Sequence, residues 1–279
     1  MSPTIAIIAP GAMGAGVASC LTAKGVPVIT SLDGRGEASR RRATASGMQD
    51  VGTSALAEAD FLLSIVPPAE AVALAQRLAP ALAASSHRTV YVDCNAVSPP
   101  TAQAVADIVA ATGCVFVDAG IIGPPPRPGT TNTKFYASGP RARDFAALND
   151  FGLIVRVLDG PLTAASALKM SYAGITKGLT ALGAAMMLAA TRGGSAQALK
   201  AELTESQPEL LRFFERMVPP MYGKAYRWVA ELDEIAGFVG AERPEGAMFT
   251  AAARFYEEIA ADVAGDSRET ATLDSFLKK

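Results

Sequence analysis

Two glycines near the start of the chain have the spacing of a phosphate-binding loop. The segment Ile5–Ala18 is an apolar run followed by Gly11, Gly14 and a helical pattern. At such a turn Gly11 lets the backbone approach a pyrophosphate, Gly14 lets the helix pack closely on the strand, and free helical N–H groups hold the phosphates. Ala9 replaces the first glycine of the usual motif. We predict that four residues of this turn bind a nicotinamide dinucleotide: Gly11, Ala12, Met13 and Gly14.

The end of the second predicted strand bears on which form of the dinucleotide is used. Enzymes that use NAD normally place an acidic residue there to hold the adenosine 2′-hydroxyl. Counting from Gly14, this position falls on Ser31 or Leu32, whereas Asp33 lies one step too far along. Ser31 and Arg35 suit a 2′-phosphate better than a carboxylate does. We therefore predict NADP as the cofactor, with NAD as the alternative if Asp33 holds the ribose.

A run of three arginines follows on a predicted helix. Arg40, Arg41 and Arg42 bring further positive charge to this end of the predicted site. For Arg41 and Arg42 we prefer the interpretation that they lie on a solvated helix face.

Lys169 is the residue best suited to move a proton. It precedes a long apolar stretch, so we expect burial to lower the pKa of its amine toward neutral pH. At helical spacing Tyr172, Ala173 and Thr176 share a stripe with it. We predict Lys169 and Tyr172 as catalytic residues, and Ala173 and Thr176 as substrate-binding residues. The alternatives are a lysine that reaches from a buried helix to water and a tyrosine that is part of the core.

Other residue types exclude several classes of site. His87 is the one histidine of the chain, so a histidine metal cluster is excluded and no metal site is predicted. A net charge of −2 gives no reason to expect nucleic acid as a partner. Three cysteines lack the spacing of a disulfide framework or a zinc site, which favours a reducing compartment: Cys20, Cys94 and Cys114.

The chain shows no pattern typical of secretion or of a membrane span. Ile5–Pro10 lacks a preceding basic segment and is predicted as a strand rather than a signal peptide. The apolar stretch Leu179–Ala190 is far shorter than the ~20 residues that a membrane helix needs. We therefore expect a cytoplasmic protein with no membrane partner.

The elements that would position these residues follow an alternating order. Most of the predicted strands are continuous apolar runs, as in parallel sheets covered on both faces: Thr4–Ala9, Pro27–Ser31, Asp60–Val66, Thr89–Asp93, Cys114–Asp118, Thr133–Ser138 and Leu153–Leu158. Helical patterns lie between them: Met13–Lys24, Gly36–Ser46, Pro68–Leu82, Pro99–Ala111 and Arg141–Asn149. This order predicts an α/β fold, a doubly wound Rossmann domain over residues 1–160.

The strand signal ends near Gly160. Long segments rich in Ala, Leu, Met and Glu follow, which predicts an all-α domain over residues 161–279 for substrate binding and dimerisation. A first helix running to about Thr191 is apolar on most faces, and we expect it to form part of a homodimer interface. In a later amphipathic helix, Glu231 and Glu234 are expected to face water, the alternative being contact with a polar or cationic substrate.

Five sequence segments occur in an order that is typical of one superfamily: Ala9–Gly14 with its Met-Gly, Ser64–Pro68, Asp93–Pro99, Asp118–Pro124, and Lys169 early in the long helix. In this order they resemble the β-hydroxyacid dehydrogenases, which include 3-hydroxyisobutyrate and 6-phosphogluconate dehydrogenases and, more distantly, imine reductases. The matching subgroup is phosphogluconate-dehydrogenase-like, with a poorly characterised C-terminal domain, so its name carries little information about substrate.

The resemblance implies roles for particular residues. Lys169 matches the catalytic lysine, and Val66 and Pro67 lie where the family loop passes the nicotinamide ribose. Asn95 is expected to contact cofactor and to take part in catalysis, the alternative being a turn residue that bonds to the backbone ahead of the helix at Pro99. The substrate loop falls on three residues: Ile122, Gly123 and Pro124.

The chain departs from the family pattern at the substrate. Ile122 replaces the family's substrate-binding serine, Pro124 its second glycine, and Ala173 an asparagine. These changes imply a pocket that is larger and more apolar than one built for a small hydroxy acid. The leading prediction is NADP-linked oxidation of a hydroxyl or reduction of a ketone, with Lys169 as acid or base. Imine reduction is disfavoured, because those relatives usually have Asp or Tyr at this position, and a non-catalytic NAD(P)-binding sensor is the third hypothesis.

Overall fold

The computed structural model describes residues 2–278 and divides into two compact units. Unit 1 is Met1–Met170 and unit 2 is Ser171–Lys279. The domain boundary predicted after residue 160 marks the end of the last strand, whereas the compact units divide ten residues later, inside a helix.

Unit 1 contains one eight-stranded sheet in the order β3-β2-β1-β4-β5-β6-β7-β8. Seven of these strands were predicted, and the sheet is parallel except for the antiparallel pair β6 and β7. The strand bounds are β1 Ile5–Ile8, β2 Val28–Thr30, β3 Gln49–Asp50, β4 Phe61–Ser64, β5 Val90–Asp93, β6 Val115–Ile122, β7 Lys134–Ser138 and β8 Val155–Val157. The expectation of a parallel sheet fails at β7 because β6 and β7 are joined by a loop without a crossover helix, and such a connection makes a hairpin.

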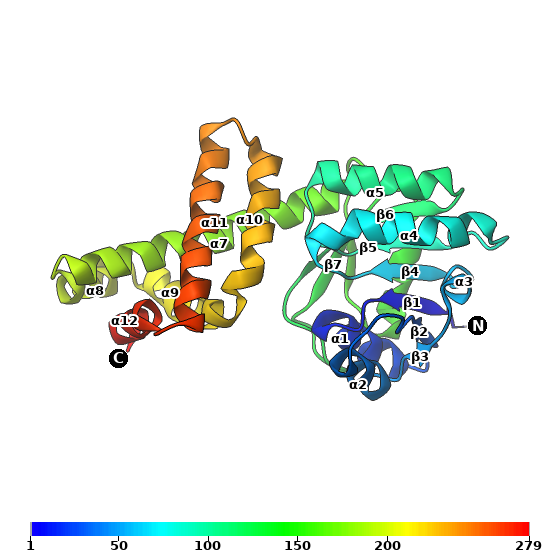
Figure 1. Ribbon diagram of the computed structural model, residues 1–279, viewed down its shortest axis with the longest axis horizontal. Coiled ribbons are helices and arrows are strands. Elements are labelled where there is room, and N and C mark those ends of the chain that lie inside the picture. The colour runs from blue at the N-terminus through cyan, green and yellow to red at the C-terminus, as the bar shows by residue number, and fades with distance from the viewer. Residues whose placement is uncertain (1, 279) are drawn as a thin grey trace. The chain divides into compact units, whose positions relative to one another are not determined.

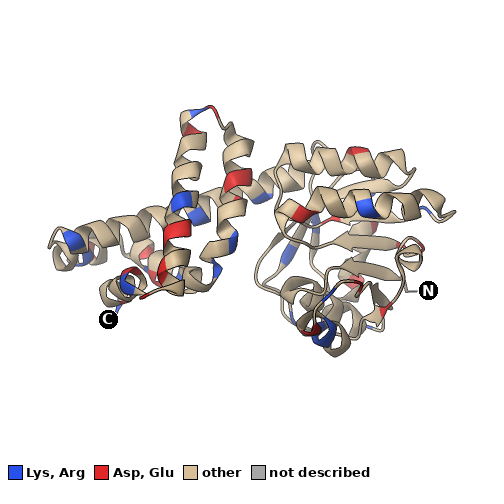
Figure 2. Ribbon diagram, in the orientation of Figure 1, with Lys and Arg blue, Asp and Glu red and all other residues tan. Residues whose placement is uncertain are grey.

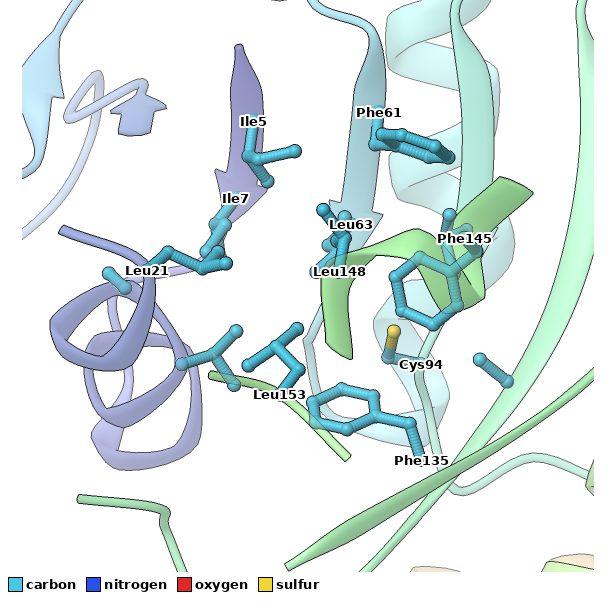
Figure 3. Packing of buried hydrophobic residues seen from close by; sticks show 14 of the residues in the cluster. Ile5, Ile7, Leu21, Phe61, Leu63, Cys94, Phe135, Phe145, Leu148 and Leu153 are labelled. Carbon is cyan, nitrogen blue, oxygen red and sulfur yellow. The ribbon is translucent and has the colours of Figure 1, made fainter. Parts of the chain in front are cut away.

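Helices cover both faces of this sheet, which explains why its strands are continuous apolar runs. The helical elements of unit 1 are α1 Ala12–Thr22, α2 Glu37–Ala45, α3 Thr53–Leu56, η1 Pro68–Glu70, α4 Ala71–Ala84, α5 Pro99–Ala111, α6 Ala142–Phe145 and η2 Ala146–Phe151. Helices α4 and α5 lie on one face, and α1 and α2 lie on the other (Figure 1). Each face has its own core, and Figure 3 shows the one in which Leu21 of α1 and Phe145 of α6 pack beside Ile7 and Leu63. The predicted α/β architecture is confirmed.

Unit 2 is helical throughout. Its elements are the larger part of α7 Ala164–Arg192, then α8 Ala196–Ser206, α9 Pro208–Met221, η3 Tyr222–Lys224, α10 Ala225–Val239, α11 Pro244–Ala264 and α12 Arg268–Leu277. Both α9 and α11 begin at a proline, whose fixed φ and missing N–H suit the first helical position. Helices α10 and α11 run side by side as a hairpin (Figure 1), and Trp228 meets Tyr256 edge to face across it, with ring centroids 5.3 Å apart.

A buried ion pair lies inside unit 2. The Lys177 amine is bonded to the Glu231 carboxylate and lies 5.4 Å from the centre of the Trp228 ring. Both charged side chains are largely buried. The expectation that Glu231 faces water was therefore wrong: Lys177 lies on the neighbouring helix, and the pairing across 54 residues of sequence cannot be read from the spacing within α10.

Helix α7 is long and apolar enough to cross a membrane if judged by length and composition alone. Its most apolar window has a mean hydropathy of 1.3, and 56% of that window is buried inside the protein. It carries three charged residues, Lys169, Lys177 and Arg192, and is otherwise drawn without charge in Figure 2. Burial of this extent is typical of a core helix in a soluble protein.

Candidate functional site

The predicted phosphate loop lies where the strand order of the sheet reverses. Strand β1 pairs with β2 on one side and β4 on the other, and its carboxyl end leads through Ala9 and Pro10 into α1. In open α/β sheets, ligands bind in the crevice outside this switch point. The chain therefore places its glycine turn at the position that the fold reserves for a ligand.

The two glycines of this turn have different surroundings. A methyl group at Gly14 would overlap the Ala9 carbonyl, so only glycine lets α1 pack this closely on the end of β1. A methyl group at Gly11 would meet no atom within 4 Å, which leaves open space beside the N-terminus of α1. Gly11 is the N-cap, and Ala12 and Met13 follow in the first turn, where backbone N–H groups lack helical partners. This turn therefore fits a phosphate group.

The adenosine end of the predicted cofactor site is held by arginines. Arg40 donates to the carbonyls of Leu32 (2.9 Å) and Arg35 (3.2 Å), which fixes the loop that follows β2. Arg42 donates from Nε to the Pro10 carbonyl (2.9 Å), directly beside the phosphate loop. Arg42 is exposed, as predicted for a solvated helix face, and the turn between β1 and α1 comes within reach of its side chain.

The predicted 2′-phosphate ligands lie in the loop held by Arg40. Ser31 and Arg35 are both partly exposed, and the Ser31 hydroxyl accepts a long bond from the Asp33 N–H (3.5 Å). Asp33 itself is exposed. Arg41 forms an exposed pair with Glu37 on the outer side of α2, as predicted for a solvated face.

Asn95 connects the ends of two neighbouring strands. It is only 4% exposed, its Oδ1 accepts the Val66 N–H (2.7 Å), and its Nδ2 donates to the Ser64 hydroxyl (2.8 Å). The side chain thus fixes the loop after β4, in which Val66 is half-buried and Pro67 is exposed. Its amide is used to shape this loop, and its predicted contact with a cofactor stays a prediction.

Lys169 lies against the end of β6. Its amine donates to the Ile121 carbonyl (2.7 Å), and the side chain is half-buried. Gly120 makes this approach possible, since a methyl group there would lie 3.0 Å from both the Ala165 carbonyl oxygen and the Lys169 Cβ. The fold therefore brings Lys169 directly beside the predicted substrate loop.

The substrate loop itself leaves β6 through a glycine that no other residue replaces easily. Gly123 has φ +134°, and a side chain there would meet Asn132 and Thr133. Ile122 is half-buried, whereas Gly123 and Pro124 are exposed. Two residues further on, Pro126 packs on Gly16 of α1, where a methyl group would lie 2.7 Å from the Pro126 carbonyl oxygen. The substrate loop and the helix of the phosphate loop are thus in direct contact.

Two buried carboxyl groups lie beneath this site. Asp93 and Asp118 are paired across β5 and β6, and each is 1% exposed. Burial raises the pKa of Asp93 to about 7, an effect that the Asn95 N–H opposes and the neighbouring Asp118 increases. Burial likewise raises the pKa of Asp118 to about 6, opposed by hydrogen bonds from Ser166 and Ala165. Neither residue was predicted to belong to the site by itself, although each is a carboxylate at the end of a predicted apolar strand, Thr89–Asp93 or Cys114–Asp118, which is a visible signal.

The remaining predicted residues belong to unit 2. Ala173 is buried, Tyr172 is about half exposed, and the Thr176 hydroxyl donates to the Tyr172 carbonyl within the helix (3.0 Å). Their roles stay predictions. Among residues 2–278, no group of three or more His, Cys, Asp and Glu side chains is arranged to hold a metal ion.

Comparison with protein families divides the chain in a similar way. Residues 4–150 match the NAD binding domain of 6-phosphogluconate dehydrogenase, and residues 190–259 match a domain of unknown function (DUF1932). A search of curated proteins finds no match.

Solved structures share the fold over nearly the whole chain. One is a conserved protein of unknown function, MTH1747, with structural similarity to 3-hydroxyacid dehydrogenases (27% identity, TM-score 0.73, covering 94% of this chain and 98% of that one). Another is the Mycobacterium tuberculosis 3-hydroxyisobutyrate dehydrogenase with L-serine (20%, TM-score 0.72, 99% of each chain). A third is the Streptomyces aurantiacus imine reductase (17%, TM-score 0.55, 99% and 100%). At these identities the last two show the fold alone.

Proposed function

The chain belongs to the family that carries the NAD binding domain of 6-phosphogluconate dehydrogenase, and on this premise we propose that it is an NADP-dependent oxidoreductase. It oxidises a hydroxyl group, or reduces a carbonyl group, of a small molecule. The observation that carries the proposal is the hydrogen bond from the Lys169 amine to the Ile121 carbonyl, one residue before the substrate loop. The nicotinamide supplies the hydride chemistry when it is bound.

Lys169 is proposed as the general acid or base. Its amine lies in a half-buried position beside Ile121 and carries the proton that a substrate oxygen gains or loses. Tyr172 and Asn95 are proposed to assist it, Tyr172 by orienting the substrate and Asn95 by holding the loop at Val66.

The cofactor is proposed to bind along the carboxyl ends of β1, β2 and β4. The first turn of α1 (Gly11–Gly14) binds the pyrophosphate, and Val66, Pro67 and Asn95 contact the nicotinamide side. Ser31 and Arg35 bind the 2′-phosphate, and this assignment is supported by Arg40, which holds their loop. NAD is the alternative, with Asp33 on the ribose.

The substrate is proposed to be larger and more apolar than a small hydroxy acid. Ile122, Gly123 and Pro124 are the proposed substrate-binding residues of unit 1, and Ala173 and Thr176 are those of unit 2. The basis is the replacement of polar groups in this loop by Ile122 and Pro124. A screen of ketones and of large hydroxy compounds with NADPH and NADP is the direct approach to its identity.

The first experiment replaces Lys169 by alanine. With a substrate found in that screen, Lys169→Ala is expected to lower kcat by about 10²–10⁴-fold, the typical contribution of a general acid or base. The dissociation constant of NADPH, followed by fluorescence transfer from Trp228 and the tyrosines, stays unchanged. Lys24→Ala is the matched control, since Lys24 is an exposed lysine of the same unit. Full activity in Lys169→Ala would overturn the assignment.

The cofactor preference has its own test. Arg35→Ala is expected to weaken binding of NADPH about tenfold and to leave binding of NADH unchanged, because only NADPH carries the 2′-phosphate. Arg41→Ala, on the exposed side of α2, is the matched control. Tighter binding of NADH than of NADPH to the wild-type protein would assign the ribose to Asp33 instead.

Two other functions stay as alternatives. Imine reduction is favoured by the imine reductase fold match alone, and the lysine at position 169 argues against it. A non-catalytic sensor of the NADPH pool is the other alternative, and it would bind NADPH and show no turnover on any compound of the screen.

We further propose a cytoplasmic homodimer formed through the helical unit. Five exposed side chains on α7 follow the 3-4 spacing of a coiled-coil stripe: Tyr172, Ile175, Leu179, Leu182 and Met186. Ile175 is 64% exposed and Leu182 60%. Three of them, Ile175, Leu179 and Leu182, line an apolar groove of about 580 Å³ between α7 and α11. On the α11 side the groove is lined by Met248, Phe249 and Phe255. Uncovered apolar surface of this kind is typical of a protein interface.

The cytoplasmic location is supported by three buried free cysteines.

A further inference from the structure

We infer that Asp118 is a positioning residue: it binds the first turn of α7 to β6 and thereby fixes the position of the Lys169 amine. The inference rests on the proposed function, because it gives Asp118 a role only through Lys169. Asp118 is thereby added to the site as a residue that supports Lys169 and does not itself touch substrate or cofactor.

Asp118 makes two short hydrogen bonds to one residue of α7. Its Oδ2 accepts the Ser166 backbone N–H and its Oδ1 accepts the Ser166 hydroxyl, both at 2.7 Å. Asp118 and Ser166 are each 1% exposed. The first N–H groups of a helix have no partner within the helix, and a carboxylate at this end is further favoured by the helix dipole. Buried charge-assisted bonds of this kind are strong and directional.

A second contact fixes the direction of the helix. The Ser138 hydroxyl at the end of β7 accepts the Ala165 N–H (3.0 Å) and donates to the Leu162 carbonyl (2.8 Å). The start of α7 is thus tied to two neighbouring strands rather than one. A helix held at two adjacent residues by two strands has a defined rotation about its axis.

That rotation determines where Lys169 lies. Ser166 and Lys169 are three residues apart and therefore on the same side of the helix. Asp118 and Ile121, their respective partners, are likewise three residues apart along β6. Gly120 lies between these two contacts and allows the helix to approach to within van der Waals distance. The carboxylate, the glycine and the Ile121 carbonyl form one contact surface for the first two turns of α7.

The test uses Asp118→Asn and Ser166→Ala in the full-length protein. Asp118→Asn removes the charge and keeps the shape, and Ser166→Ala removes one of the two bonds. Because small displacements of a catalytic group are costly, we expect each variant to lower kcat about tenfold. The KM for substrate and the NADPH dissociation constant stay within about twofold, since the residues that bind both are unchanged.

Three further measurements distinguish positioning from a general loss of stability. Ser166→Thr keeps the hydroxyl and is expected to retain the wild-type kcat. Thr89→Val removes a buried hydroxyl that bonds to the Ala57 and Ala59 carbonyls at the other end of β5, so it is expected to lower the Tm without lowering kcat. In the Lys169→Ala background, Asp118→Asn is expected to have no further effect on the residual rate.

The outcomes separate this inference from the proposed function. Wild-type kcat in folded Asp118→Asn and Ser166→Ala, with an inactive Lys169→Ala, would overturn the positioning role and leave the proposed function intact. A tenfold loss on adding Asp118→Asn to Lys169→Ala would also overturn it, because Asp118 would then act independently of the lysine. A fully active Lys169→Ala would instead refute the proposed function.

Discussion

The two units of this protein differ in the kind of side chain that lies in an unfavourable environment. Unit 1 buries polar groups on three neighbouring strands, including Ser64 of β4, Asp93 of β5 and Asp118 of β6. Unit 2 leaves large apolar side chains uncovered: eight of the nine exposed large hydrophobic residues in the described part of the chain lie there, and only Val157 lies in unit 1.

This difference separates two kinds of function. Burying a carboxyl group costs free energy unless it is hydrogen-bonded, and unit 1 does so beneath the residues proposed for chemistry. Exposing a continuous apolar stripe to water also costs free energy, and this cost is removed for the stripe on α7 when another surface covers it. In the proposed function, unit 1 therefore binds the small molecules and unit 2 supplies the interface with a second copy of the chain.

The largest expected effect breaks the apolar side of this comparison. The double substitution Ile175→Glu and Leu182→Glu is expected to raise the dimer dissociation constant by about 10³-fold or more, because two carboxylates would lose water at the interface. Sedimentation velocity measures the change. Val263→Glu, at an exposed apolar residue of α11 that does not line the groove, is the matched control. An unchanged sedimentation coefficient in the double variant would place the interface elsewhere.

The next effect concerns the buried ion pair, which is the exception to the pattern of unit 2. Glu231→Gln leaves the Lys177 amine buried without a countercharge and is expected to lower the free energy of unfolding by about 3 kcal/mol. Urea denaturation measures it. Glu37→Gln, which breaks the exposed pair with Arg41, is expected to cost at most about 0.5 kcal/mol. If the two variants lost equal stability, the idea that burial makes the Lys177–Glu231 pair more important for stability than an exposed pair would be wrong.

The smallest effect sharpens the polar side of the comparison. Because burial raises the pKa of Asp93 to about 7, the folded protein binds more protons than the unfolded chain between about pH 4 and pH 7. The contribution of Asp93 to stability therefore falls as the pH rises through this range. Asp93→Asn removes this dependence, so its stability relative to wild type is expected to rise by about 2 kcal/mol between pH 5 and pH 8. Parallel stability curves for the two proteins would show that Asp93 does not titrate there.

The order of the elements was predictable because each local pattern agrees with the fold. The helix predicted over Pro99–Ala111 is observed with those bounds, since Ser98 and Pro99 supply both an N-cap residue and a first-turn proline. Strand β3 was missed because its two residues, Gln49 and Asp50, are polar and exposed, and carry no apolar signal. The reversed direction of β7 depends on how the irregular loop before it turns, and the hydrophobic periodicity of the sequence does not predict this.

The site was predictable only where a motif lies within one stretch of sequence. Gly14 was predicted from its own stretch of sequence and Lys169 from its place in the family order, and their roles stay predictions. The contact of Arg42 with Pro10 spans 32 residues, and that of Asp118 with Ser166 spans 48. Such pairs are created by the packing of separate elements, so that neither partner indicates the other in the sequence.

The loop that joins β6 to β7 has a consequence for the kinetics of folding. It contains four prolyl bonds, at Pro124, Pro125, Pro126 and Pro128, all trans in the folded chain. With ~10–30% cis at each such bond in an unfolded chain, between about a third and three quarters of the refolding molecules start with at least one wrong isomer here. These bonds equilibrate over about 10–100 s. The sheet and helices can form while the loop still lacks its contact with Gly16, so we expect recovery of enzymatic activity to trail recovery of circular dichroism, and a prolyl isomerase to close the gap.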